Sequence, residues 1–221
     1  MHRVEIQGFS IVAVGDFNPK IFQPQWFAMQ ELITSEEASR ADVEIIHPDL
    51  CSFSLEWCSI QVTRERYLIR TLMDPYFERL RDITLNTFSL LEHTPVRMIG
   101  MNFDVHYSTR SQVEWHDIGH QLAPKDLWSE TLDNPGLRSL VVQESVRRDK
   151  RTGHIQVRVE PSNQIANGIF LHMNDHYQLQ TSLEPAASKE LVEILDQGWA
   201  TSSERWKQTR DAFERFAGGL D

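Results

Sequence analysis

The stretch Ile99-Gly100-Met101-Asn102-Phe103-Asp104-Val105-His106-Tyr107-Ser108 places an apolar side chain at every second position. Alternate residues of a β-strand point to opposite sides of a sheet, so this strand has one apolar and one polar side. The pattern recurs at 154–160 and at 169–179, the latter after the turn sequence Asn167-Gly168. Such strands are typical of antiparallel sheets, because parallel strands are usually apolar on both sides.

Two stretches have helical spacing instead, with apolar residues at every third or fourth position. The first covers 75–92 and begins at Asp74-Pro75, an N-cap residue followed by a proline suited to a first helical turn. The second runs from about 188 to Gly218-Gly219, where paired glycines favour a helix end. Both helices offer an apolar stripe that a sheet can cover.

The expected order of elements is the same in residues 1–94 and 95–221. The predicted strands are 4–14, 42–47, 51–62, 67–72, 98–109, 138–146, 154–160 and 169–179. The predicted helices are 24–33, 75–92, the stretch 113–131 as one helix or two short ones, and the C-terminal stretch. The fold class is α+β: a curved antiparallel sheet with helices on one face, made of two β-α-β-β-β-α halves packed as one globular unit. This order resembles the duplicated helix-grip architecture of the TATA-binding-protein fold.

Composition limits the class of protein. Of 221 residues, 40% are hydrophobic and 24% charged, which is typical of a globular chain and not of a disordered or fibrous one. Mean hydropathy is -0.42, and no apolar run approaches the roughly 20 residues that span a bilayer. The first residues lack the apolar segment of a signal peptide. We therefore expect a cytoplasmic protein that does not bind membranes.

The charge balance bears on partners. There are 22 Lys and Arg residues against 32 Asp and Glu, a formal net charge of -10. Such a surface repels polyanions and disfavours nucleic acid as a partner. Cys51 and Cys58, placed on one predicted strand about 23 Å apart, cannot form a disulfide bond, and we expect two buried thiols.

The polar sides of the predicted strands meet on one surface if the apolar sides pack on the helices. Two interpretations remain open: a solvated sheet face, or a concave binding surface. The residues expected there are Asn102, Asp104, His106, Gln156, Arg158, His172, Asn174 and His176.

The motif His116-Asp117-Ile118-Gly119-His120 resembles the His-x-x-x-His spacing of zinc hydrolases. Its Asp117 is shorter than the glutamate that such chemistry uses, and Gly119 weakens a helix. His106 is the best distant third ligand. We assign no metal site and no cofactor, and keep a metal-dependent hydrolase or small-ligand enzyme using His116 and His120 as an alternative.

Other catalytic signatures are missing. The sequence has no Gly-x-Gly phosphate loop and no Gly-x-Ser-x-Gly nucleophile elbow. The adjacent Glu36 and Glu37 fall in an expected polar linker, where solvated charge is the default. The sequence thus favours a non-enzymatic protein.

A basic cluster, Arg147-Arg148-Asp149-Lys150-Arg151, lies at the expected turn between strands 138–146 and 154–160. The turn Thr63-Arg64-Glu65-Arg66 is also basic. One interpretation is that these charges keep the hairpins soluble. The other is a pair of basic tips, with Arg147, Arg148 and Arg151 contacting an acidic protein or phosphate groups.

Trp199 and Trp206 lie on one stripe of the C-terminal helix. We expect them in the core, or at the seam of a homodimer if that helix protrudes.

Several segments resemble a sporadically distributed set of uncharacterised bacterial proteins: 53–57, 61–67, 94–102 and the terminal helix with Phe213 and Phe216. The resemblance implies a bacterial, cytoplasmic α+β protein and no particular activity.

Together these features predict an interaction protein that binds another macromolecule, most simply a protein, through the polar sheet face or the basic hairpin tips. Nucleic-acid binding through the tips is a further alternative that the charge of -10 disfavours.

Overall fold

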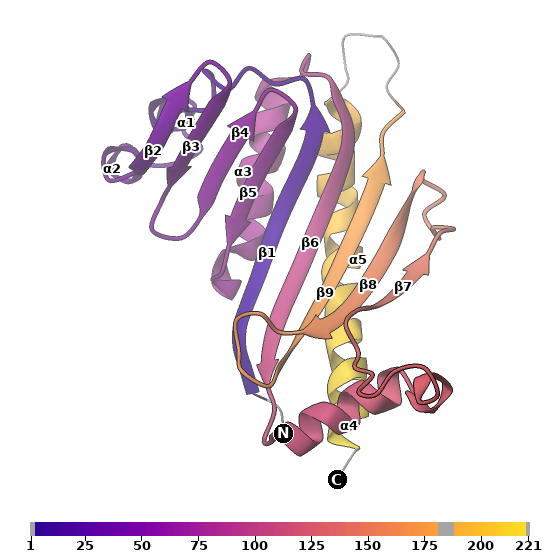
Figure 1. Ribbon diagram of the computed structural model, residues 1–221. Helices are drawn as coiled ribbons and strands as arrows, with labels where there is room; N and C mark the ends of the chain where they lie inside the picture. Colours follow the sequence, from indigo (N-terminus) through magenta and orange to yellow (C-terminus); the bar gives the residue numbers. More distant parts are fainter. Residues whose placement is uncertain (1–2, 181–187, 220–221) are drawn as a thin grey trace.

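The computed structural model describes residues 3–180 and 188–219. Within these residues, nine strands form one antiparallel sheet in the order β2-β3-β4-β5-β1-β6-β9-β8-β7 (Figure 1). The strands are β1 (Arg3–Gly15), β2 (Asp42–His47), β3 (Leu50–Ser54), β4 (Ser59–Thr63), β5 (Arg66–Thr71), β6 (Val96–Ser108), β7 (Leu140–Glu144), β8 (Gly153–Pro161) and β9 (Gly168–Gln178). The expected α+β class and antiparallel sheet are confirmed.

The helical segments are α1 (Pro24–Met29), α2 (Ser35–Ser39), the 3-10 turn η1 (Asp74–Tyr76), α3 (Phe77–Leu90), α4 (Gln112–Leu122), the 3-10 turn η2 (Asp126–Trp128) and α5 (Lys189–Gly218). α3 and α5 lie side by side behind the sheet in Figure 1, and α4 lies beyond one end of its strands. The predicted helix 113–131 is therefore α4 followed by η2. Among the described helices, none combines the length and the apolar character needed to cross a membrane.

The core lies between the sheet and the α3–α5 layer. At the sheet centre, Phe9 of β1 faces Phe103 of β6, with ring centroids 4.6 Å apart. Trp199 of α5 packs edge-on against Phe9 at 5.0 Å, and Trp206 stacks on Phe103 at 5.8 Å. Both tryptophans are buried by the sheet. The stripe they define is core, as expected, and α5 does not hold it out as a dimer seam.

The segment between β1 and β2 covers the helix side of the sheet's β2–β3 end. Phe27 of α1 packs on Phe53 of β3, with ring centroids 5.9 Å apart. The expectation that Glu36 and Glu37 lie in a linker is wrong, because Thr34 and Glu37 form a capping box that starts α2.

The predicted strand 51–62 is wrong, because the chain reverses at residues 55–58. There the Leu55 amide donates a hydrogen bond to the Cys58 carbonyl at 2.7 Å, which closes the turn between β3 and β4. Cys51 and Cys58 therefore lie on different segments, although both are buried thiols outside any disulfide, as expected. Burial raises the pKa of Cys58 to about 12, so this thiol stays protonated.

The turn at residues 55–58 adds a strand to the first half of the chain. From β1 outward the sheet runs β5, β4, β3 and β2, whereas from β6 outward it runs β9, β8 and β7. The first half therefore has one strand more than the predicted β-α-β-β-β-α order. Its edge strand β2 is exposed along its whole length.

Candidate functional site

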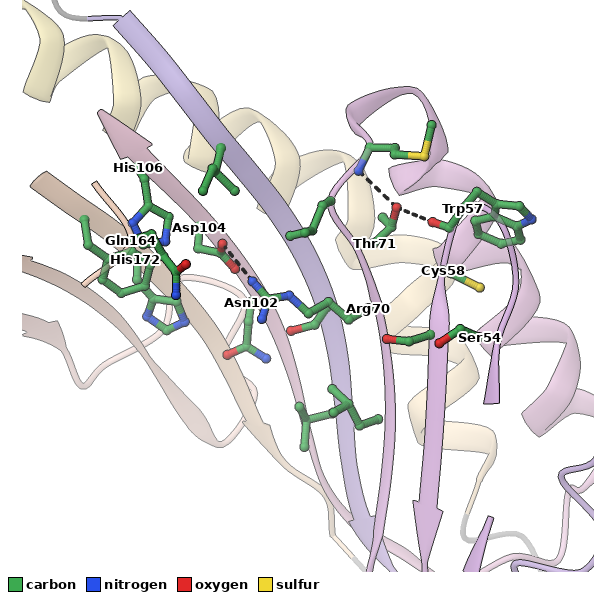
Figure 2. A pocket seen from close by; sticks show the side chains of 18 of the residues that line it. Ser54, Trp57, Cys58, Arg70, Thr71, Asn102, Asp104, His106, Gln164 and His172 are labelled. Atoms are coloured by element: carbon green, nitrogen blue, oxygen red, sulfur yellow. Dashed lines mark hydrogen bonds and ion pairs between the residues drawn. The ribbon is translucent and has the colours of Figure 1, made fainter. Parts of the chain in front are cut away.

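A hollow of about 910 Å³ opens on the sheet face opposite α3 and α5 (Figure 2). We call it the polar trough. It crosses six neighbouring strands, represented in sheet order by Ser59, Arg70, Ser10, Asp104, His172 and Arg158. Five strand spacings make it about 24 Å long. Trp57 and Cys58 lie at one end, and Gln164 at the other.

Two glycines leave room for polar side chains on this face of the sheet. Gly8 of β1 is paired with Asp104 of β6, and a Cβ at Gly8 would lie 2.8 Å from the Asp104 Oδ2. A Cβ at Gly100 of β6 would lie 3.1 Å from the Oδ1 of Asn174. Glycine within a strand commonly marks a place where another group approaches the backbone closely. Here the missing side chains make room for Asp104 and Asn174.

Asp104 is the buried acid of the trough, with 6% of its surface exposed. Arg70 extends from β5 and donates from its Nη2 to the Asp104 Oδ2 at 3.3 Å. Burial raises the pKa of Asp104, although the charge of Arg70, and that of His106 in its protonated form, act in the opposite direction. The charged form of Asp104 therefore carries a cost in desolvation, which its pairing with Arg70 offsets only in part.

His106 is held by Ser162 of the β8–β9 loop, with the His106 Nδ1 2.8 Å from the Ser162 Oγ. That Oγ also accepts from the backbone amides of Gln164 at 3.1 Å and Ile165 at 2.9 Å. With both lone pairs engaged, the hydroxyl proton is donated to His106, so neutral His106 carries its own proton on Nε2. Burial lowers the pKa of His106, which favours this neutral form.

His172 of β9 lies between Asp104 of β6 and Arg158 of β8 in the strand register. Burial, with the positive charges of Arg158 and Arg70, lowers the pKa of His172 to about 4. Three polar atoms of this region are buried without a hydrogen-bond partner among the described residues: Arg158 Nε, His172 Nδ1 and Asn174 Oδ1. Such atoms are uncommon in folded proteins and call for a specific explanation.

The structure brings together most of the residues expected on the polar face. Asn102, Asp104, His106, Arg158 and His172 line the trough. Asn174 faces Asn102 across the β6–β9 pair and Gln156 across the β8–β9 pair. His176 lies further along β9, where its ring stacks on that of His154 at 4.7 Å. His154 was not among the expected residues.

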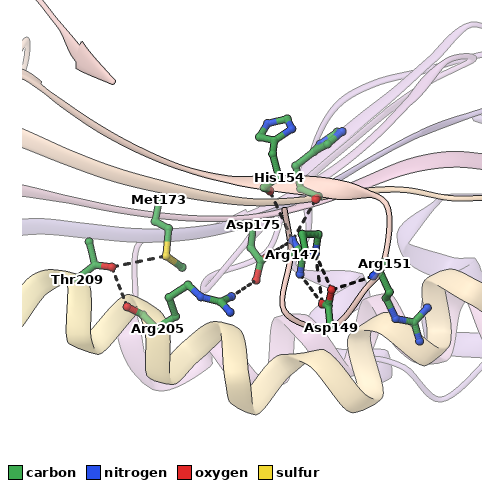
Figure 3. Close-up of polar contacts among 9 residues, drawn as sticks. Arg147, Asp149, Arg151, His154, Met173, Asp175, Arg205 and Thr209 are labelled. Carbon is green, nitrogen blue, oxygen red and sulfur yellow. Dashed lines mark hydrogen bonds and ion pairs between the residues drawn. The ribbon is translucent and has the colours of Figure 1, made fainter. Parts of the chain in front are cut away.

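The expected basic tip between β7 and β8 is different in the structure (Figure 3). Arg147 turns inward, with only 1% of its side chain exposed, and donates to Asp149 at 2.7 Å and to Asp175 of β9. Arg151 lies 3.7 Å from both Glu190 and Glu193 of α5. Of the three arginines proposed as a tip, Arg148 is the exposed one. The expectation of a cationic tip is corrected accordingly, because buried and helical carboxylates take up the charge of the other two.

His116 and His120 lie exposed on α4, whereas His106 lines the trough. The structure does not bring these three histidines together. Across residues 3–180 and 188–219, no group of three or more His, Cys, Asp or Glu side chains is placed to hold a metal ion.

Sequence reasoning missed Arg70 and Ser162. Arg70 occupies a polar position between the buried residues Ile69 and Thr71, but its place beside Asp104 depends on β5 pairing with β1. Ser162 lies in a loop, where strand alternation carries no information. The signal it did offer is its spacing from Gln164 and Ile165, which is typical of a serine turn.

No family model matches this chain, and no curated protein matches it either.

Proposed function

We propose that this protein is a non-enzymatic binding protein, and that the polar trough holds an extended segment of a partner protein. The observation that carries the proposal is the shape of the trough, which crosses six strands as one continuous hollow. Its length of about 24 Å matches about seven residues of extended chain. Its lining combines charged, amide and imidazole groups with apolar side chains such as Leu68 and Phe170, a mixture that suits a peptide segment more than a purely apolar ligand.

Two potential nucleophiles, Cys58 in the trough lining and Ser162 beside the lining residue His106, are poorly suited to catalysis. The Ser162 Oγ accepts two backbone hydrogen bonds and donates to His106, so its lone pairs are engaged. Cys58 is held as a thiol by its raised pKa, and the thiol is a weak nucleophile. These features favour binding over a covalent reaction.

Nucleic-acid binding through the β7–β8 turn has less support than protein binding. Arg147 is buried against Asp149 and Asp175, and the net charge of the chain is -10. An approaching phosphate would therefore meet Arg148 and Lys150 in an acidic surrounding.

A library of displayed seven-residue peptides tests the proposal. Peptides selected on the wild-type protein are measured against Ser10→Phe, since Ser10 lies on the trough floor between Arg70 of β5 and Asn102 of β6. We expect binding to weaken by about tenfold or more, because the ring fills the space that the peptide needs. The matched control is Ser89→Phe on the exposed side of α3.

Equal binding to both variants, or a library that yields no binder, overturns the proposal. If Ser10→Phe does not fold, as judged by circular dichroism and melting temperature, Leu68→Trp fills the same trough from a half-buried position on β5.

We infer in addition that residues 1–94 and 95–221 are related by duplication. The runs β1-β5-β4-β3 and β6-β9-β8-β7 have the same order outward from the sheet centre, and α3 and α5 lie together behind it. The likeness to a duplicated helix-grip fold rests on this order. A superposition of the two runs that fails to bring α3 onto α5 contradicts it.

A further inference from the structure

We propose that the Arg158 end of the polar trough is a carboxylate-binding subsite, and that it takes an acidic side chain or the terminal carboxylate of the partner segment. This inference rests on the proposed function and adds the chemical class that the trough selects. It is drawn from two arginines of the trough lining, Arg70 and Arg158, whose guanidinium N–H groups are incompletely paired within the described residues.

Arg158 is the first of these arginines. Its nearest carboxylate, Glu160, lies 3.7 Å from the Arg158 Nε, beyond hydrogen-bonding distance. The Nε itself is buried and has no hydrogen-bond partner in the part of the chain that the structure describes. A guanidinium has five N–H groups in a fork that matches the two oxygens of a carboxylate. The Arg158 side chain is 38% exposed, so the guanidinium can turn and present its Nε–H and an Nη–H together to a carboxylate from outside.

Arg70 is the second arginine. It approaches from β5, and its hydrogen bond to Asp104 engages one nitrogen, Nη2, at 3.3 Å. Nearly half of its side chain, 46%, is exposed, so its remaining N–H groups are free to turn towards a ligand. His172 of β9 lies between them in the strand order, since Arg70 is on β5 and Arg158 is the direct partner of His172 on β8.

The other groups on the trough floor are compatible with a bound anion. His172 is neutral near pH 7, so it adds no charge of its own, and neutral His106 offers an Nε2–H. Three basic and three acidic residues line the whole trough: Arg66, Arg70 and Arg158, and Glu56, Asp104 and Glu160. Since these charges balance, the attraction for a carboxylate comes from the unpaired guanidinium N–H groups and not from the net charge of the trough.

The first arm of the test uses glutarate, a small dicarboxylate, as the probe. Side-chain NMR of the arginine Nε–H groups and histidine rings follows its binding to the full chain. We expect saturable shifts at Arg158 and Arg70 and a rise in the pKa of His172, because a bound anion stabilises the imidazolium.

The matched variants are Arg158→Gln and Arg148→Gln, which remove one positive charge each. Loss of a charge-assisted pair weakens glutarate binding by about tenfold or more in Arg158→Gln. At exposed Arg148 the effect stays within about twofold, because the charge is screened. Equal weakening in both variants, or no saturable shift in the wild type, overturns the subsite.

The second arm uses the peptides selected for the trough. Replacing each Asp or Glu by Asn or Gln, and amidating the peptide end, identifies the carboxylate that matters. We expect one such change to weaken binding to the wild type by about tenfold and to have no further effect on Arg158→Gln.

The two arms separate this inference from the proposed function. Peptides that bind the trough without needing a carboxylate overturn the subsite and leave the proposed function in place. Glutarate binding without any trough-dependent peptide supports the subsite as a small-anion site and overturns the protein partner.

Discussion

Arg147 and Arg158 are two arginines at opposite extremes of pairing. Arg147 contacts Asp149 and Asp175, lies 3.6 Å above the Tyr177 ring and is 1% exposed. Burial alone would lower its pKa, but the hydrogen bonds that it donates to the two carboxylates raise it. Arg158, by contrast, has no hydrogen bond at its buried Nε within the described residues, and its nearest carboxylate is at 3.7 Å. A saturated arginine holds a fold together, whereas an unsaturated one is available to a ligand.

The largest effect is expected at the saturated site. Asp175 is fully buried, and its oxygens accept from Arg147 and from Arg205 of α5 (Figure 3). In Asp175→Asn the buried cation of Arg147 keeps only Asp149 as a charged partner, so we expect a loss of about 3–5 kcal/mol in the free energy of unfolding. Chemical denaturation measures it. A loss below about 1 kcal/mol contradicts a structural role for this cluster.

The second largest loss of stability is expected from a substitution on the trough floor. In Gly8→Ala the new Cβ lies 2.8 Å from the Asp104 carboxylate, which must move. We expect a cost of about 1–3 kcal/mol, typical of overpacking. Adding Asp104→Ala removes the clash, so the double variant should lose less stability than the sum of the single ones. Additive losses in thermal or chemical unfolding are incompatible with this account.

The low pKa of His172 predicts a smaller effect on the free energy of unfolding, and this effect depends on pH. Burial and the charges of Arg158 and Arg70 lower it to about 4, while Glu160 acts in the opposite direction. The unfolded chain, with an ordinary histidine pKa, takes up a proton first as the pH falls. Stability from this group is thus complete above about pH 6.5 and is lost as the pH falls through about 4.

We expect this loss to reach about 2 kcal/mol after allowance for solvent screening. His172→Gln should reduce the slope of unfolding free energy against pH between 4 and 6.5. His116→Gln, at an exposed position on α4, controls for the loss of an imidazole. A wild-type slope retained in His172→Gln would assign the proton uptake to other groups.

How much of the site was predictable depends on the kind of signal. Alternation placed Asn102, Asp104 and His106 on one side of a strand, because the period of two is fixed by strand geometry. The approach of Arg70 to Asp104 required β5 to pair with β1, a long-range choice that local patterns do not encode.

At Arg147 the local sequence pattern led to a wrong prediction. Its turn sequence indicates solvated charge, yet a buried acid draws it inward. The available signal was Asp175, which occupies an apolar position between Met173 and Tyr177 in the alternation of β9. An acid in that register predicts a buried basic partner, although not which one.

The smallest change in stability is expected at Asp104, where the same substitution can be compared directly with Asp175→Asn. Asp104→Asn removes a carboxylate whose raised pKa shows that burial disfavours its charged form, and its partner Arg70 is 46% exposed and can turn to water. We expect the free energy of unfolding near pH 7 to change by less than about 1 kcal/mol, against the large loss in Asp175→Asn.

The same substitution should strengthen binding. Asp104 holds the Nη2 of Arg70 and repels an incoming anion, so its neutral analogue leaves both arginines to the ligand. We expect glutarate to bind several-fold more tightly to Asp104→Asn than to the wild type, about 1 kcal/mol in favour. Weaker binding in this variant would mean that Asp104 orients Arg70 for its ligand, and the unsaturated arginine would then be Arg158 alone.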